Sequence, residues 1–174
     1  MPDTREDSGA RNGQGEMSNL AGKYLTFKLA NEEYGLEIMK VQEIIGMMPI
    51  TRVPRVPDYV RGVINLRGRI IPTIDLRKKF SLGETEDTEK TCIIVVESQS
   101  PKGKINMGIV VDEVAEVLDI AGQDIDQTPE FGTSLDTEFI MGLGIVKGEV
   151  KMLLDIDKVL STEEARTVES LTQQ

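Results

Sequence analysis

Apolar and polar residues alternate along several stretches of the chain, which is the pattern of half-buried β-strands. Between Lys23 and Ala30, the apolar residues Leu25, Phe27 and Leu29 occupy every second position. Comparable patterns, rich in β-branched residues, predict further extended segments at 34–38, 41–47, 60–66, 69–73, 91–98, 106–120 and 139–156. The chain is therefore expected to be mostly β.

Glycine and proline residues mark the turns and breaks between these segments. Arg67 and Gly68 are predicted to form a tight turn, because glycine adopts positive φ without strain. Prolines between Pro49 and Pro57 prevent a regular ladder in that stretch. Pro72 has no backbone N–H to donate, so its strand is predicted to lie at a sheet edge or to carry a bulge at that point.

Capping residues predict three short helices. Asp75 can accept a hydrogen bond at the start of a helix over 76–80, whose last turn carries cations where the helix dipole favours them. A second short helix is expected at 155–160. The Ser-Thr-Glu-Glu run at 161–164 fits a capping box and predicts a C-terminal helix.

Two blocks of the sequence recur in the same order. Residues 59–80 align with residues 139–160 at a constant offset of 80, and both copies place Gly at the hairpin turn and Asp at the helix cap. Residues 35–45 align with residues 108–118 at an offset of 73. A repeat of this kind predicts an internal duplication into two small barrels. A barrel of about 60 residues buries little core alone, so the two are expected to share a core, with a groove between them.

The repeat suggests a simple division of the chain. Residues 1–22 are polar, without apolar periodicity, and are expected to be a flexible acidic or polar tail. The barrel units are expected at about 23–80 and 91–160, and an exchange of strands between them is left open. Residues 81–90 form a polar linker, and residues 161–174 a C-terminal helix with a frayed end.

Charge changes this picture in one place. The chain has a formal net charge of −10 and a pI of about 4.6, which argues against binding to nucleic acid or to an anionic membrane surface. Yet residues 51–80 contain eight basic residues and only two acidic ones. One repeat unit therefore carries a positive face in an otherwise acidic protein.

The residue types exclude most catalytic and metal chemistry. There is no histidine, so triads, metal sites and proton shuttles that need histidine are excluded. Cys92 is the only cysteine and is expected to be buried and inert. Asp112 and Glu113 are neighbours on a strand and point to opposite faces, which is poor geometry for an acid/base pair. No catalytic residue, metal or cofactor is expected.

No apolar run approaches the roughly 18 residues needed to span a bilayer, and the first residues do not read as a signal peptide. The protein is therefore expected to be cytoplasmic, without direct membrane insertion.

The stretch VQEIIGMMPITRVPRVPDYVRGVINLRGRIIPTIDLR, starting at Val41, resembles the CheW family, the coupling proteins of bacterial chemotaxis. The blocks EYGLEIMKVQEI and GIVVDEVAEVL and a late GLG-x-x-x-G stretch fit in order, so the similarity runs from about Lys23 to Leu160. The resemblance implies an all-β fold of two pseudo-symmetric, five-stranded SH3-like barrels packed together, with short helices and a C-terminal helix. It also implies a non-catalytic adaptor.

The resemblance further implies two partners. One is the cytoplasmic helical tip of chemoreceptors, and the other is the regulatory domain of the histidine kinase CheA. Such an adaptor couples the two in receptor arrays at the inner face of the membrane, where receptors control kinase activity. A CheW-like adaptor for another pathway, such as pilus motility, is the alternative. An enzyme using carboxylates in the groove and a nucleic-acid-binding barrel fit the residues less well.

Site residues carry over from the resemblance position by position. The receptor-facing groove is expected at Val41, Glu43, Ile44, Arg61, Gly62, Val63, Asn65, Leu66, Arg67 and Gly68. The kinase contact is expected on strands of the second barrel, around Cys92, Ile94, Val111, Val114 and Val117.

Several of these residues also have a purely structural interpretation. Arg67 can be a solvated turn residue, and Asn65 can either satisfy the turn backbone or contact a partner. Val41 and Ile44 can be core residues or an apolar strip for a receptor helix. Gly62 can allow close packing of the barrel or close approach of a partner.

Overall fold

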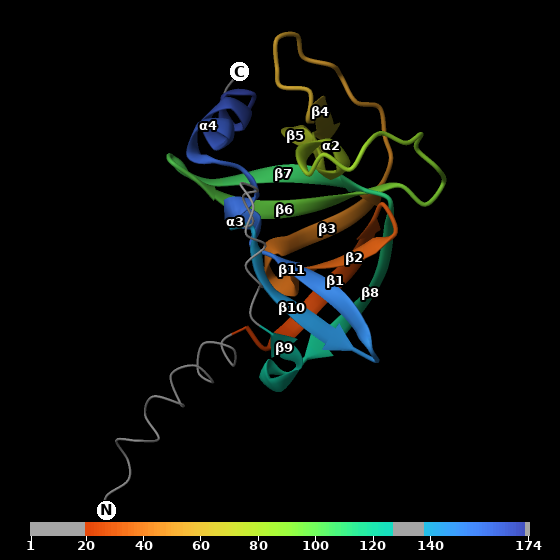
Figure 1. Cartoon of the computed structure of the whole chain (residues 1–174). Coiled ribbons are helices and arrows are strands. Elements are labelled where there is room, and N and C mark those ends of the chain that lie inside the picture. Colours follow the sequence, from red (N-terminus) through yellow and green to blue (C-terminus); the bar gives the residue numbers. More distant parts are fainter. Residues whose placement is uncertain (1–19, 127–137, 173–174) are drawn as a thin grey trace, which may run out of the picture.

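Two β-sheets form the body of the molecule in a computed structural model that describes residues 20–126 and 138–172 (Figure 1). The six-stranded sheet contains, in spatial order, β8 (Glu113–Ile120), β1 (Gly22–Leu29), β2 (Glu32–Glu37), β11 (Glu149–Leu154), β10 (Ile140–Val146) and β9 (Ile125–Asp126). The five-stranded sheet contains β3 (Val41–Gly46), β6 (Cys92–Ser100), β7 (Gly103–Val111), β5 (Arg69–Asp75) and β4 (Val60–Leu66). The expectation of an all-β fold is confirmed.

Short helices complete the fold. The α-helices are α2 (Leu76–Lys79), α3 (Ile156–Val159) and α4 (Thr162–Ser170), and the 3-10 helices are η1 (Ile38–Lys40) and η2 (Gly122–Asp124). Asp75 caps α2 by accepting a hydrogen bond from the backbone N–H of Lys78 at 3.3 Å. Ser161 and Glu164 form the predicted capping box at the start of α4. No helix among residues 20–126 and 138–172 is both long and apolar enough to cross a membrane.

Each sheet takes strands from both halves of the chain. In the six-stranded sheet, β2 pairs in parallel with β11, and Gly35 lies opposite Leu153. In the five-stranded sheet, β7 pairs in parallel with β5, and Gly108 lies opposite Thr73. Gly35 and Gly108 are equivalent in the sequence repeat, and so are Thr73 and Leu153. The two units are therefore joined by a reciprocal exchange of strand hairpins.

One large core lies between the two sheets. It contains fully buried side chains from the first sheet, such as Phe27 and Leu36, and from the second, such as Ile94 and Ile109. Val168 of α4 also contributes to it. Each sheet has its own smaller core on the other face. The shared core explains why two small barrels form one stable unit.

The five-stranded sheet closes on itself where the chain leaves β3. Thr51 and Val63 exchange two backbone hydrogen bonds of 2.9 Å each. Gly62 has a φ of +145°, and a Cβ atom placed on it would lie 2.1 Å from the carbonyl oxygen of Thr51. Gly142, its repeat equivalent, lies at the corresponding irregularity between β10 and β11. The interpretation of Gly62 as a barrel-packing residue is therefore confirmed.

The prediction places Pro72 at a sheet edge or at a bulge. The bulge alternative agrees with the irregular register beside it, where Val60 and Gly62 of β4 face Ile74 and Thr73 of β5. The edge alternative is wrong. β5 lies between β4 and β7, so it has a neighbour on each side. However, β7 pairs only with Thr73–Asp75, and Pro72 lies just outside that paired segment. The missing backbone donor is tolerated because the ladder on that side begins one residue later.

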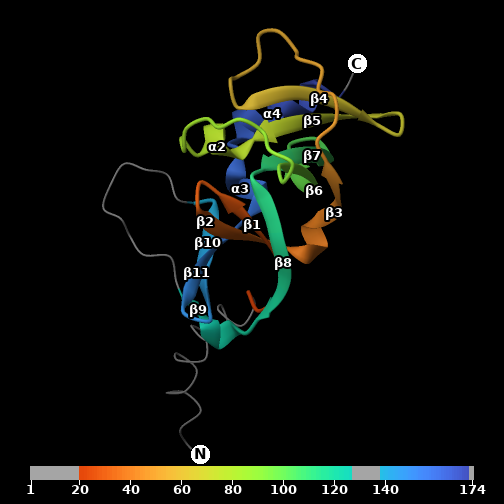
Figure 2. The same cartoon turned by 90° about the vertical axis from the view of Figure 1, so that its right-hand side faces the viewer.

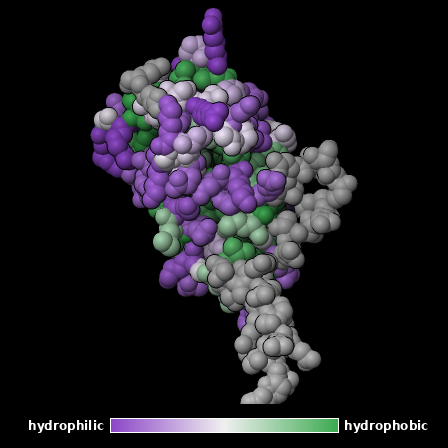
Figure 3. All heavy atoms as spheres, turned by 90° about the vertical axis from the view of Figure 1, so that its left-hand side faces the viewer, coloured by the Kyte–Doolittle hydropathy of each residue, from purple (hydrophilic) through white to green (hydrophobic). Residues whose placement is uncertain are grey.

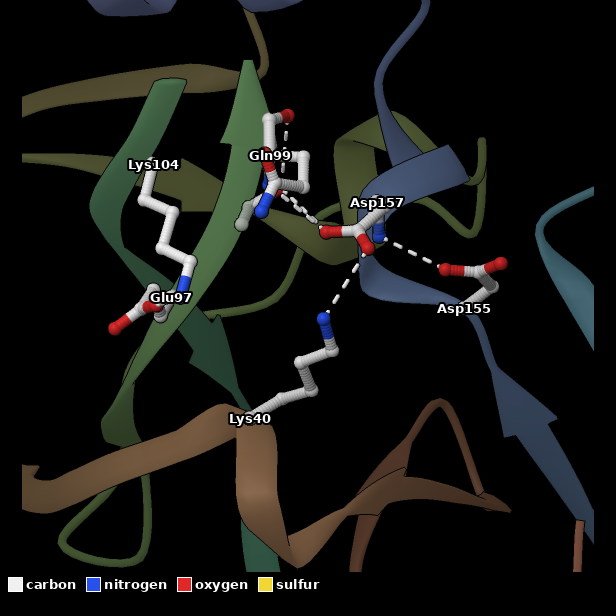
Figure 4. A network of polar contacts seen from close by, with 7 residues as sticks. Lys40, Glu97, Gln99, Lys104, Asp155 and Asp157 are labelled. Atoms are coloured by element: carbon white, nitrogen blue, oxygen red, sulfur yellow. Dashed lines mark hydrogen bonds and ion pairs between the residues drawn. The ribbon is translucent and has the colours of Figure 1, made fainter.

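A polar network ties the C-terminal part of the chain to the five-stranded sheet (Figure 4). Asp157 of α3 accepts hydrogen bonds from the backbone N–H of Gln99 at 2.9 Å and from the Ser98 hydroxyl at 3.3 Å. It also forms an ion pair with Lys40 of η1 at 3.2 Å. The backbone N–H of Asp157 donates to Asp155, which caps the helix. One carboxylate thus connects three segments that are distant in sequence.

The expected N-terminal tail lies almost entirely outside the described residues, of which Leu20 is the first. Leu20 packs against the smaller core of the six-stranded sheet. The boundaries of the two units at 23–80 and 91–160 stay a prediction about the repeat.

Candidate partner-binding surface

Arg67 lies at the tip of the β4–β5 hairpin and forms an ion pair with Glu43 of β3. Its φ of +53° and that of Gly68, +86°, are those of the predicted tight turn. β3 and β4 are the two outer strands of the five-stranded sheet, so the ion pair spans the seam between its edges. The Arg67 side chain remains 67% exposed. Its guanidinium is therefore held in position and still open to a further acceptor.

Asn65 satisfies the backbone of this turn. Its side-chain oxygen accepts a hydrogen bond from the N–H of Gly68 at 2.9 Å. The structural interpretation of Asn65 is confirmed, and it fixes the hairpin tip that presents Arg67. The equivalent turn in the second unit, Lys147–Gly148, has the same positive φ values. In the described part of the chain, however, Lys147 has no ion pair, so the fixed cation is a property of the first unit alone.

The apolar residues predicted for the receptor groove divide into exposed and buried ones. Ile44, next to Glu43 on β3, is 45% exposed. Leu66 is buried in the smaller core, and Val41 packs partly against the shared core. Val63 is half-buried. Among these residues, Ile44 offers the most apolar surface to a partner.

Two exposed apolar residues were missing from the predicted site. Ile70 is 43% exposed and lies directly across the hairpin from Asn65. Met39, in η1 just before β3, is 91% exposed. The sequence does not show that Ile70 faces solvent, because it is followed directly by a second isoleucine, Ile71, and alternation does not tell which of the two is buried. On the face shown in Figure 3, hydrophobic residues appear as small patches between hydrophilic ones.

Arg61 lies at the opposite end of β4 from Arg67. They are six positions apart along an extended strand, which corresponds to about 20 Å. Figure 2 shows the tip of the β4–β5 hairpin on one side of this sheet and the segment after α2 on the other. The structure therefore brings Glu43, Arg67 and Gly68 together, but not Arg61 and Gly62 with them.

Arg61 instead binds Asp87 in the linker, with two hydrogen bonds of 3.0 and 2.8 Å. This paired geometry lowers the pKa of the Asp87 carboxyl and raises the pKa of the Arg61 guanidinium. In both cases the hydrogen bond between the two side chains is the largest cause. A charge-assisted contact thus fastens the linker to the start of β4.

An open groove of about 980 Å³ lies between the loop after β3 and this linker. Its apolar side is formed by residues such as Met47, Met48, Ile50 and Val56. Its charged side includes Arg61 and Lys78, together with acidic residues of the linker. The groove combines adaptable methionine side chains with a charged wall, which are properties of a protein-binding surface.

The residues predicted for the kinase contact also divide by exposure. Ile94 and Val111 face the shared core and have no exposed side-chain surface of note. Cys92 is partly buried, and burial is the main cause that raises the pKa of its thiol. On β8, Val114 is half-buried and Val117 is 51% exposed. The accessible part of this set therefore lies on β8, the outer strand of the six-stranded sheet.

Asp112, Asp75 and Asp155, in the described part of the chain, serve structural roles. Asp112 accepts from the Arg77 guanidinium at 2.7 Å and from the backbone N–H of Ala30 at 2.9 Å. Asp75 and Asp155 cap helices, as predicted. No cluster of metal-binding side chains occurs within residues 20–126 and 138–172.

Comparisons with known proteins agree in sequence and in structure. The family model of the CheW-like domain matches residues 23–164. Chemotaxis protein CheW of Klebsiella aerogenes is 42% identical over 166 residues, which cover 92% of this chain and 98% of that protein. Chemotaxis protein CheW of Bacillus subtilis is 36% identical over 147 residues, which cover 83% and 90%. The crystal structure of the scaffolding protein TtCheW from Thermoanaerobacter tengcongensis superposes with a TM-score of 0.73 at 33% identity, covering 83% of this chain and 95% of that one.

Proposed function

The chain belongs to the CheW-like family, and from this membership we propose that it is a non-catalytic chemotaxis adaptor. It couples the cytoplasmic tips of chemoreceptors to the regulatory domain of the histidine kinase CheA. In this role it acts in receptor arrays at the inner face of the membrane. The relatives named as chemotaxis proteins and the scaffolding protein of similar fold support this assignment.

The receptor end of the adaptor is the seam between β3 and β4. The observation that carries this assignment is the fixed but exposed guanidinium of Arg67, held by Glu43 beside the exposed Ile44. A guanidinium offers several donors in a rigid fork and can bind a carboxylate of a partner helix while its other donors stay on Glu43. Ile44 adds apolar contact area next to it.

The kinase end lies on the other unit, at the outer strand β8. Val117 is half exposed there, and Val114 lies partly buried three residues before it. An outer strand can accept a further strand or an apolar surface from a partner domain. Two separate surfaces on two units allow the adaptor to hold both partners at once.

The test measures binding of the full chain to two partners separately, a receptor cytoplasmic tip fragment and the CheA regulatory domain. The key variant is Arg67→Glu. Lys147→Glu is its matched control, because it makes the same charge change in the equivalent turn of the second unit, where it breaks no ion pair among residues 20–126 and 138–172. We expect Arg67→Glu to lose affinity for the receptor fragment and to bind the CheA regulatory domain as the wild-type chain does.

Each outcome of this experiment has a clear meaning. Equal loss of receptor binding in Arg67→Glu and Lys147→Glu would show that only overall charge matters, and would remove Arg67 from the site. Loss of both partners in Arg67→Glu would point to damage to the fold. A wild-type chain that binds neither partner would contradict the proposed function itself.

A further inference from the structure

The linker after α2 carries an acidic segment, defined here as residues 84–89, with the sequence Glu-Thr-Glu-Asp-Thr-Glu. Every residue from Gly83 to Lys90 is exposed, and none of them belongs to a strand or helix. The nearest side chains with substantial burial are Leu82 before the segment and Thr91 after it. No apolar contact therefore anchors the acidic segment itself.

Ionic contacts hold this segment against the basic wall of the groove. Asp87 makes its two hydrogen bonds to Arg61, and Glu84 forms an ion pair with Lys78 at 3.1 Å. Arg77 donates to the backbone carbonyl of Gly83 at 3.3 Å. The Glu84 side chain is 77% exposed, so its ion pair is accessible to water. Ion pairs of this kind contribute little free energy and are easily exchanged for others.

The basic groups under the segment are better fixed than the segment itself. Arg61 and Lys78 are 27% and 30% exposed, and they lie on the strand β4 and the helix α2. Arg52 adds a third cation at the groove, and it has no ion pair in the described part of the chain. Asp58, Asp75 and Asp112 also line the groove, but Arg61 and Lys78 are the cations that the acidic segment covers. Fixed cations covered by a segment of opposite charge resemble an occupied binding site.

We propose that Arg61 and Lys78 form a docking site for an acidic segment of a partner protein, and that the acidic segment of this chain competes for the same site. The occupant is an acidic stretch flanked by apolar residues, because Met47, Met48 and Ile50 line the groove beside the cations. The inference rests on the proposed function for its partner, the receptor tip. A tethered segment competes effectively despite weak contacts, since its local concentration is in the millimolar range.

Two substitutions break the same ion pair from opposite sides and separate this proposal from a structural role. Asp87→Asn removes the carboxylate that binds Arg61 and leaves Arg61 itself unchanged. The acidic segment then competes less well, so affinity for a receptor tip fragment should rise about two- to fivefold. Arg61→Gln removes the docking cation, so affinity should fall by about the same factor. Glu89→Gln is the matched control, because it removes one charge from the same segment without breaking an ion pair of the described residues. It should leave affinity unchanged.

A second measurement does not depend on the receptor. A synthetic peptide of residues 82–91 of this chain is titrated into the full-length double variant Glu84→Gln/Asp87→Asn, and backbone amide shifts are recorded by NMR. We expect saturable shifts around Arg61 and Lys78 in the variant and weaker ones in wild type, where the site is already occupied. The peptide itself supplies the ligand chemistry that the proposal requires.

The outcomes distinguish the two proposals. If Asp87→Asn and Arg61→Gln weaken receptor binding equally, the ion pair only stabilises the fold and the docking site is overturned, while the adaptor function stands. If the wild-type chain binds no receptor fragment, the proposed function is contradicted for that partner. The docking site is then tested by the peptide titration alone. Absence of peptide-induced shifts near Arg61 in the variant would then overturn the docking site as well.

Discussion

Thr51 and Val63 close the five-stranded sheet into a barrel through two mutual backbone hydrogen bonds of 2.9 Å. The contact links the loop after β3 to the outer strand β4, and it brings the two edges of the sheet together. The lack of a side chain on Gly62 makes this approach possible. Barrel closure is therefore a sufficient reason for the glycine at this position, and a role of Gly62 in receptor binding stays a prediction.

Gly62→Ala should consequently destabilise the protein by about 2 kcal/mol or more, because the new Cβ atom meets the Thr51 carbonyl and the φ of +145° is strained for alanine. Urea denaturation measures the free energy of unfolding. Gly46→Ala is the control, since a Cβ atom there meets nothing within 4 Å. Similar stability of the two variants would contradict the closure argument.

The ion pair between Glu43 and Arg67 spans the same seam, but it should contribute much less to stability. Arg67 is 67% exposed, and exposed ion pairs are worth about 0–1 kcal/mol. A double-mutant cycle with Glu43→Ala and Arg67→Ala, followed by urea denaturation, should give a coupling energy below about 1 kcal/mol. A coupling well above that value would mean that Arg67 acts in the fold, and its effect on receptor binding would then be indirect.

Local sequence was sufficient to predict most elements of this fold. The alternation of Leu25, Phe27 and Leu29 correctly predicts a strand. The expectation that this strand is only half-buried is wrong, because Tyr24 and Thr26 on its other face are buried as well. Gly68 and Asp75 mark a turn and a helix start because each supplies a conformation or an acceptor that few residues offer. These features depend on neighbours within a few residues, so a single sequence contains them.

The candidate site was less accessible to sequence reasoning. The partners in the Glu43–Arg67 pair are 24 residues apart, and Arg61 and Asp87 are 26 residues apart. Such contacts depend on how strands pair across the sheet, which alternation alone does not specify. The burial of Ile94 and the exposure of Ile70 follow from the same pairing. Sequence reasoning therefore found the residue types of the surface but not their grouping.

The Asp157 network shown in Figure 4 should be important for stability. Its carboxylate accepts hydrogen bonds from Gln99 and Ser98 and pairs with Lys40, so Asp157→Ala leaves these donors without their acceptor. We expect a loss of about 1–3 kcal/mol in the free energy of unfolding, measured with urea.

Lys104→Ala provides the contrast within the same view of the molecule. Lys104 is 66% exposed and pairs with Glu97 on the neighbouring strand, so its removal should change stability by less than about 0.5 kcal/mol. Equal effects of Asp157→Ala and Lys104→Ala would mean that the α3 network is only a surface feature.

Tyr24 should make the protein sensitive to alkaline pH. Burial, with a smaller contribution from Glu37, raises the pKa of its hydroxyl from 10.0 to about 12, and the hydroxyl donates to the backbone carbonyl of Leu20 at 2.5 Å. Below pH 10 the hydroxyl is protonated in both the folded and the unfolded chain. Between pH 10 and about 12 the unfolded chain releases this proton while the folded chain retains it, so stability falls as pH rises through that window.

The substitution Tyr24→Phe tests this effect. It should lower stability at pH 8, because it removes a hydrogen bond worth about 1 kcal/mol, but it should make the decline above pH 10 less steep. Part of the decline should remain, because burial also raises the pKa values of Tyr34 and Tyr59. Urea denaturation at several pH values between 8 and 11.5 measures both effects. Leu25→Val, a core variant without a titrating group, should retain the wild-type slope. If Tyr24→Phe retains it as well, the tyrosine does not control alkaline stability, because its proton is then released at the same pH in the folded and the unfolded chain.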